Sequence, residues 1–240
     1  MPPPKIRVFA TPAIVAEAAA QHIAESAESA LRDTGSFAIA LSGGNTPRML
    51  YQLLADEPYV SRIDWSKVEI FFGDERCVPP EDRESNFHRA SETLLDLVPI
   101  PPANIHRIRG EIDPQAAAIE YGQLLKQRFA DGGLDFALLG MGEDGHTASL
   151  FPGSAALAET NHRCVANFVD NLNAWRITMT VPFLNRSKQI LMLVTGSAKA
   201  ERVQQALEPT DAAEPLPVQL INPSSGHLTW FLDAAAACME

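Results

Sequence analysis

The sequence predicts an α/β fold, in which a mostly parallel β-sheet is flanked by helices in a single domain spanning residues 1–240. Three observations carry this prediction. Short apolar runs typical of buried strands alternate with longer segments whose apolar residues recur at helical spacing. Polar, glycine-containing loops follow several of the apolar runs directly. Neither an internal repeat nor a long linker divides the 240 residues, a length that suits one large α/β domain.

The first half of the chain supplies strands and helices in alternation. In chain order, the expected elements are a strand over 6–10, a helix over 13–32, a strand over 37–44, a helix from residue 46, a strand over 68–75, and helices over 86–98 and 114–130. The first helix carries apolar residues every four positions from Val15 to Leu31, and Gly35 ends it. Thr46 and Pro47 supply the N-cap and first-turn proline of the next helix.

The second half continues the same alternation. We expect strands over 134–142, 176–184, 188–196 and 228–233, and a helix that begins near Ser197. The proline-rich stretch at 209–217 is expected to be a surface loop rather than a domain boundary.

Charge and composition exclude several classes of protein. A formal net charge of −11 repels polyanions, so we expect no nucleic-acid partner, although a local cluster of cations and backbone N–H groups still accommodates a small anion. The longest apolar runs are far shorter than the roughly 20 residues that a bilayer requires. The three cysteines form no C-x-x-C pair and the N-terminus lacks a secretory pattern, so the expected location is the cytoplasm.

Polar loops follow four of the predicted strands at the points where they end. These loops are Ser42–Thr46, Gly73–Arg76, Gly140–His146 and Gly196–Lys199. Ligands of open parallel sheets bind outside the carboxyl ends of the strands, so the four loops predict one site at that edge.

The loop Ser42–Thr46 has the composition of an anion-binding turn. Its two glycines let the backbone approach an anion, and the helix after it offers unpaired N–H groups. A tight strand-to-helix turn is the plain alternative. Lys199, at the start of another helix, is either a phosphate counter-charge or a solvated lysine. Arg176, which opens a predicted strand, is either a further cation of the site or a member of a surface ion pair.

The stretch Gly73–Arg76 places three charged side chains on consecutive residues. Because side chains alternate at a strand end, Asp74 and Arg76 would point into one cleft while Glu75 points away. A charged loop rim, or a pair between Arg76 and Glu75, remains the alternative.

The loop GMGEDGH contains the G-x-G-x-x-G spacing of dinucleotide-binding proteins. Pro152-Gly153 stops any helix soon after the third glycine, so we interpret the match as accidental. Asp144 and His146 lie two residues apart in this loop, where a carboxylate can orient an imidazole that acts as a general base. The other histidines are scattered, so we expect no metal site.

With these residues in view, the chain resembles the 6-phosphogluconolactonase family. The matching blocks are SGGNTP (42–47), GDERCVPPEDRESNF (73–87), LLGMGEDGHTASLFPG (138–153), RITMT (176–180) and GSAKA (196–200). They follow the family's order and span most of the chain. Glucosamine-6-phosphate deaminase shares the fold but carries a glutamate where this chain has Phe151, and an apolar ring cannot perform carboxylate chemistry.

The resemblance implies a Rossmann-like fold and hydrolysis of 6-phospho-D-glucono-1,5-lactone without a metal or organic cofactor. It implies catalytic roles for His146 as base, for Asp144 in orienting it and for Arg76 in stabilising the oxyanion. The implied substrate-binding residues are Ser42, Gly43, Gly44, Thr46, Asp74, Asn86, Arg176 and Lys199. The chain departs from the family at Arg89, where methionine is frequent, and in the stretch 171–175 before Arg176.

Three alternatives stay open at this stage. A deaminase-like isomerase would release ammonia, and a sugar-phosphate sensor would need the Ser42 loop and Lys199 but neither Asp144 nor His146. A dinucleotide-dependent oxidoreductase would need a long helix after Gly145. We expect a phosphosugar lactone as the small-molecule partner, no membrane partner, and a monomer or weak homo-oligomer.

Overall fold

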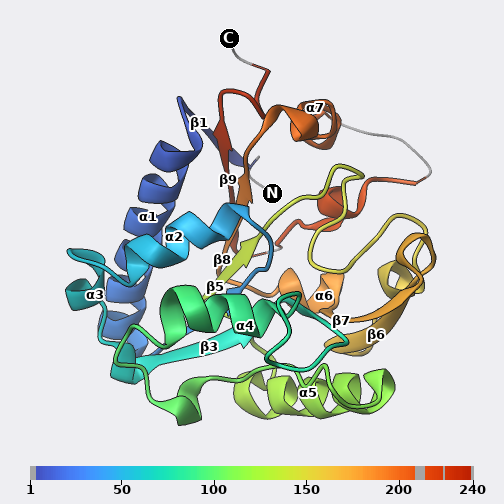
Figure 1. Ribbon diagram of the computed structural model, residues 1–240, viewed down its shortest axis with the longest axis horizontal. Helices are drawn as coiled ribbons and strands as arrows, with labels where there is room; N and C mark the ends of the chain where they lie inside the picture. Colours follow the sequence, from blue (N-terminus) through green and yellow to red (C-terminus); the bar gives the residue numbers. More distant parts are fainter. Residues whose placement is uncertain (1–3, 209–213, 224, 239–240) are drawn as a thin grey trace.

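A six-stranded parallel sheet forms the centre of the molecule in a computed structural model that describes residues 4–208, 214–223 and 225–238 (Figure 1). Its strands, in spatial order, are β1 (Lys5–Phe9), β9 (His227–Asp233), β8 (Gln189–Val194), β5 (Phe136–Leu139), β2 (Phe37–Leu41) and β3 (Val68–Phe72). All five strand pairs are parallel. The α/β fold predicted from the sequence is therefore confirmed.

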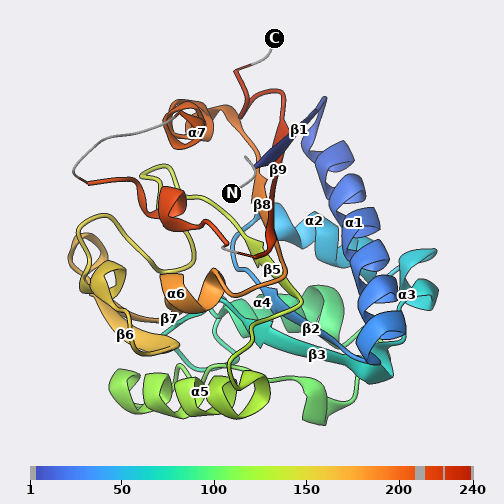
Figure 2. The same ribbon diagram turned by 180° about the vertical axis from the view of Figure 1, so that it is seen from behind.

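Helices cover both faces of this sheet (Figures 1 and 2). On one side lie α1 (Pro12–Thr34), α2 (Thr46–Leu54) and α3 (Tyr59–Arg62), and on the other lie α5 (Pro114–Phe129) and α6 (Val181–Leu184). Two further helices are α4 (Asn86–Ala90) and α7 (Ala200–Leu207). Across the described ranges, no helix is both long and apolar enough to cross a membrane.

A second, three-stranded antiparallel sheet differs from the predicted strands. It consists of β4 (Asp74–Arg76), β7 (Ala174–Met179) and β6 (Cys164–Val169). The predicted strand over 68–75 is divided at Gly73, whose N–H donates to the carbonyl of Leu41 in β2 while its own carbonyl accepts from Met179 in β7. Gly73 is thus the point at which the chain passes from one sheet to the other.

The prediction of one strand over 176–184 is also wrong. β7 ends at Met179, and the following residues form α6, in which Pro182 occupies the first turn. Proline lacks an N–H for a strand ladder but fits the start of a helix.

The predicted helix over 86–98 is shorter than expected, since α4 passes into a π-helical turn that ends at Leu95. Of the predicted loop at 209–217, residues 209–213 lie outside the described part.

The order of the strands defines a topological switch point between β2 and β5. After β2 the chain adds β3 on one side, and β5 then pairs with β2 on the opposite side. The loops that leave β2 and β5 therefore diverge at the carboxyl edge of the sheet, which is where open α/β sheets bind ligands. These are the loops that begin at Ser42 and Gly140.

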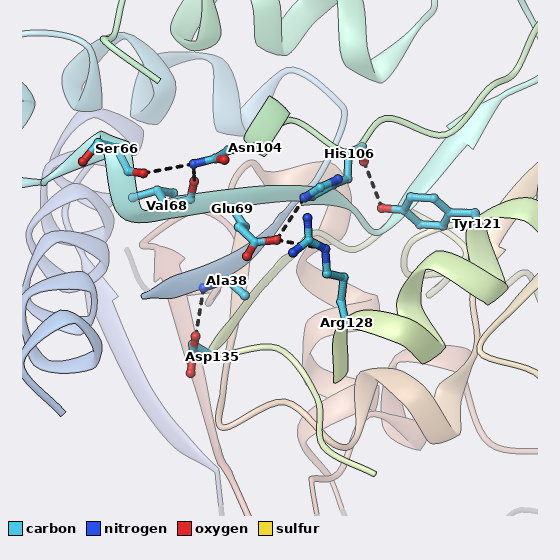
Figure 3. A network of polar contacts seen from close by, with 9 residues as sticks. All are labelled: Ala38, Ser66, Val68, Glu69, Asn104, His106, Tyr121, Arg128 and Asp135. Carbon is cyan, nitrogen blue, oxygen red and sulfur yellow. Dashed lines mark hydrogen bonds and ion pairs between the residues drawn. The ribbon is translucent and has the colours of Figure 1, made fainter. Parts of the chain in front are cut away.

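Polar contacts fasten α5 to the edge strand β3 (Figure 3). His106 Nε2 lies 2.9 Å from Glu69 Oε2, and Arg128 Nε lies 3.5 Å from the same oxygen. The His106 ring stacks on Phe71 with 4.7 Å between ring centroids, and its backbone carbonyl accepts from the hydroxyl of Tyr121. Burial lowers the pKa of His106 and outweighs the opposing effect of Glu69.

The lowered pKa of His106 predicts a loss of stability on acidification. Below the ordinary histidine pKa of about 6.5, the unfolded chain binds a proton that folded His106 resists, so the free energy of unfolding decreases as the pH falls. Urea denaturation at pH 7.5 and 5.5 should show a smaller decrease for His106→Gln than for the unsubstituted chain. His162→Gln, which replaces an exposed histidine, is the control. An equal decrease in the unsubstituted chain and His106→Gln would exclude this origin.

Candidate active site

A cavity of about 190 Å³ lies at the switch point and brings most of the predicted site residues together. The predicted residues that line it are Ser42, Gly43, Gly44, Thr46, Asp74, Arg76, Asn86, His146 and Lys199. Gly140, Met141, Gly142 and Ala148 of the β5 loop line it as well. Two predicted residues, Asp144 and Arg176, do not line the cavity. Asp144 contacts His146, and Arg176 lies beside Arg76 in the neighbouring strand.

The His146–Asp144 pair has the geometry of an oriented base. Asp144 Oδ1 lies 2.5 Å from His146 Nδ1 and accepts a second hydrogen bond from the His146 backbone N–H at 3.1 Å. Because the carboxylate accepts from Nδ1, the neutral imidazole presents Nε2 as its acceptor. Burial disfavours ionised Asp144, but the hydrogen bonds and charge of His146 outweigh this effect and lower the pKa of Asp144. The carboxylate is therefore ionised when it supports the imidazole.

Gly142 explains the glycine spacing that resembled a dinucleotide motif. A Cβ at this position would lie 2.1 Å from His146 Cε1 and 2.2 Å from His146 Nδ1. The Gly142 N–H also donates to the carbonyl of His146, which closes the turn at 2.9 Å. The absence of a side chain at Gly142 thus leaves room for the imidazole, and the long helix that a dinucleotide site needs does not follow.

Phe151 packs directly on the imidazole. The two rings stack with centroids 4.2 Å apart and an interplanar angle of 27°. The side chain at this position is therefore an apolar support for His146, and it brings no carboxylate to the cavity.

Glu75 does not pair with the guanidinium of Arg76. Its buried carboxylate instead accepts hydrogen bonds from the backbone N–H groups of Arg76, Asn86 and Phe87 and from the Ser85 hydroxyl. Burial raises the pKa of Glu75 against these hydrogen bonds. The carboxylate holds the start of α4 against β4. Arg76 Nη1 donates to the backbone carbonyl of Glu84, and Arg76 lines the cavity.

Asp74 and Asn86 form a buried network behind the cavity. Asp74 Oδ2 accepts from the Ser149 hydroxyl at 2.5 Å, and Asp74 Oδ1 accepts from Asn86 Nδ2 at 3.1 Å. Asn86 Oδ1 has no hydrogen-bond partner within the described part of the chain, and neither has the hydroxyl of Ser42. Both groups belong to residues that line the cavity, but the two oxygens themselves are buried, and a Cβ at Gly43 would lie 1.8 Å from Asn86 Oδ1.

The cations of the site differ in their positions. Arg176 lies opposite Arg76 in the β4–β7 ladder and faces a neighbouring groove. Burial lowers the pKa of Arg176, and the charge of Arg76 adds to this effect while Asp74 opposes it. Lys199 lines the cavity itself, and burial lowers its pKa against the opposing charge of Glu143.

If Lys199 holds the phosphate of the ligand, as the resemblance implies, its lowered pKa predicts weaker phosphate binding at alkaline pH. A phosphate monoester is already a dianion above about pH 7, so its charge stays constant while the ammonium of Lys199 is lost below the usual lysine range. Calorimetry with 6-phosphogluconate between pH 7 and 10 should show an affinity loss of about tenfold, the value of one charge-assisted hydrogen bond. Lys199→Arg, whose guanidinium stays charged, should show a smaller loss. A pH-independent affinity would contradict this role of Lys199.

Sequence reasoning missed the supporting residues of the site. Ser149 and Phe151 lie in the quoted block at 138–153, but their contacts with Asp74 and His146 depend on how the loop folds back. No group of three or more potential metal ligands occurs within residues 4–208, 214–223 and 225–238.

The switch point of the parallel sheet brings together a glycine loop, a lysine and an oriented histidine. These features are those of an α/β protein that acts on a small anionic ligand. Residues 10–230 match the family described as glucosamine-6-phosphate isomerases/6-phosphogluconolactonase. The chain belongs to this family.

Relatives and solved structures agree with that assignment. The chain is 39% identical to 6-phosphogluconolactonase of Haemophilus influenzae over 82% of this chain and 85% of that protein. It is 37% identical to a probable chloroplastic 6-phosphogluconolactonase of Oryza sativa over 97% and 75%. The structure of 6-phosphogluconolactonase from Trypanosoma cruzi superposes with a TM-score of 0.87 at 30% identity, covering 98% of this chain and 96% of that one. A monomeric glucosamine-6-phosphate deaminase, at 21% identity, TM-score 0.84 and coverage of 98% and 100%, shares the fold.

Proposed function

We propose that the protein hydrolyses 6-phospho-D-glucono-1,5-lactone to 6-phospho-D-gluconate, the second step of the oxidative pentose phosphate pathway. The observation that carries the proposal is the convergence of an oriented imidazole and a glycine loop with a lysine on one cavity. The family and the names of the relatives support the same reaction.

In the proposed mechanism, His146 Nε2 takes a proton from a water molecule as its oxygen attacks the lactone carbonyl carbon. Arg76 stabilises the negative charge that develops on the carbonyl oxygen. The ring C–O bond then breaks, and the imidazolium returns the proton to the departing ring oxygen, which becomes the C5 hydroxyl of the open acid. Asp144 stabilises the transient imidazolium throughout.

The proposed binding mode places the 6-phosphate at Gly43, Gly44 and Lys199. Ser42 and Thr46 complete this loop, and Arg176 contributes positive charge from the neighbouring strand. Asn86, which lines the same cavity, is assigned to the binding of a sugar hydroxyl. Asp74 is engaged through both oxygens, so we assign it a positioning role at the cavity wall.

We further propose that residues 1–240 act as one lactonase domain without a metal or organic cofactor. The proposed setting is the cytoplasm, as a monomer or weak homo-oligomer with no nucleic-acid partner. The net charge of −11 supports the expected absence of a nucleic-acid partner.

The test follows acid release from the phosphorylated lactone in a pH-stat, with the spontaneous rate subtracted. We expect acceleration with 6-phosphogluconolactone and a much higher KM for the unphosphorylated lactone, and the activity should survive chelator. Glucosamine 6-phosphate should release no ammonia. Ammonia release without lactone hydrolysis would replace the proposal with the deaminase function, and NAD(P) binding would favour an oxidoreductase.

A further inference from the structure

A second cavity, of about 480 Å³, shares the glycine loop with the proposed active site. Ser42, Gly43, Gly44 and Asn45 line both cavities. The remaining lining residues of the second cavity are Arg48, Tyr51, Arg83, His88, Arg89, Glu92 and Thr93. We call it the arginine cavity.

The arginine cavity carries positive charge that the protein does not neutralise. None of the guanidinium groups of Arg48, Arg83 and Arg89 forms an ion pair within the part of the chain that the structure describes. The one acidic residue in the lining, Glu92, lies 3.6 Å from His88. Three unpaired arginines around one cavity are notable in a chain with a net charge of −11, and they favour an anionic ligand.

Arg89 is held in place for such a ligand. Its Nε donates to the backbone carbonyl of Arg83 at 2.9 Å, and its own carbonyl accepts from the Thr93 hydroxyl at 2.6 Å. Neither terminal nitrogen of the guanidinium bonds to another residue that the structure describes, and the two form the fork arrangement that binds phosphate through two hydrogen bonds.

The polar lining indicates the chemical class of the ligand. The wall offers hydroxyl, amide and guanidinium groups, together with the imidazole of His88 and the carboxylate of Glu92. Tyr51 is buried, and its hydroxyl donates to the backbone carbonyl of Ser42. The volume is within the range of small-ligand pockets and suits a phosphorylated sugar.

We propose that the arginine cavity binds the second phosphate of a sugar bisphosphate whose first phosphate occupies the glycine loop of the active site. The shared loop Ser42–Asn45 places the two anion sites next to each other. Sugar bisphosphates are then competitive inhibitors of this protein. The inference rests on the phosphate site of the proposed function, but it requires no catalytic step.

The test compares D-fructose 1,6-bisphosphate with D-fructose 6-phosphate by calorimetry at fixed ionic strength. The bisphosphate should bind at least about tenfold tighter, since one additional charge-assisted contact contributes that factor. The double variant Arg83→Gln/Arg89→Met should reduce the ratio to within about twofold of unity. Arg48→Gln, an exposed side chain on α2 whose loss should not disturb folding, should reduce it in part. Arg32→Gln, at the exposed end of α1, removes the same charge and should preserve the ratio.

Equal affinities of the two probes in the unsubstituted chain would overturn the proposal, as would a ratio that survives the double variant and Arg48→Gln. A double variant that weakens the monophosphate as much as the bisphosphate would also overturn it, because the arginines would then hold the first phosphate. Absence of lactonase activity with an intact ratio would refute the proposed reaction and leave the second anion site standing.

Discussion

Replacing His146 by alanine should lower kcat for 6-phosphogluconolactone by about 10²–10⁴-fold, the usual contribution of a positioned general base. The proposed mechanism has no second base for the attacking water, because Asp144 acts through His146 Nδ1. KM should change little, since the proposed phosphate contacts come from the loop Ser42–Thr46 and Lys199. The measurement is acid release in a pH-stat, with the spontaneous rate subtracted at each lactone concentration.

Two further variants make the His146 result specific. Asp144→Asn keeps an acceptor for Nδ1 but removes the charge that stabilises the imidazolium, so its kcat should lie between those of His146→Ala and the unsubstituted chain. His162→Ala, at an exposed histidine outside the cavity, should retain kcat. If His146→Ala hydrolyses the lactone at the unsubstituted rate, the imidazole is not the base.

The predictable part of the site consists of residues that are close in the sequence. Asp144 and His146 are two residues apart in a short turn, so their contact follows from local geometry. The alternation of side chains at a strand end likewise predicted that Glu75 would point away from Asp74 and Arg76, and the structure places it so. Parallel strands then bring separate loops to one edge, which is a property of the fold class.

The unpredicted part depends on contacts between distant segments. The strand Cys164–Val169 pairs with β7 in an antiparallel sheet. The sequence pattern of 176–184 does not show that β7 belongs to this second sheet, or that the strand ends before Pro182. The position of Arg176 beside Arg76 follows from the pairing of β7 with β4. Ser149 reaches Asp74 across 75 positions of sequence, a contact that only the folded loop reveals.

In the sequence, Gly142 belongs to a glycine motif without an assigned role, whereas in the structure it leaves room for the imidazole of His146. Its substitution tests this structural role. Gly142→Ala places a Cβ where the imidazole of His146 lies, since the two nearest ring atoms would be 2.1 and 2.2 Å away. The ring must move, and Phe151 on its face and Asp144 at Nδ1 limit the directions open to it. A displacement of about 1 Å costs on the order of 10²-fold in rate, so kcat should fall by about that factor.

Gly140→Ala is the matched control for this substitution. It lies two residues earlier in the same motif, but a Cβ there would meet only the carbonyl of Leu193, at 3.9 Å. Its kcat should therefore fall far less than that of Gly142→Ala, and 6-phosphogluconate should bind both variants with similar affinity. A dinucleotide cradle would instead make both glycines necessary for close approach of a pyrophosphate. Equal losses of kcat in the two variants would thus contradict the packing of His146 against Gly142 as the reason for the glycine.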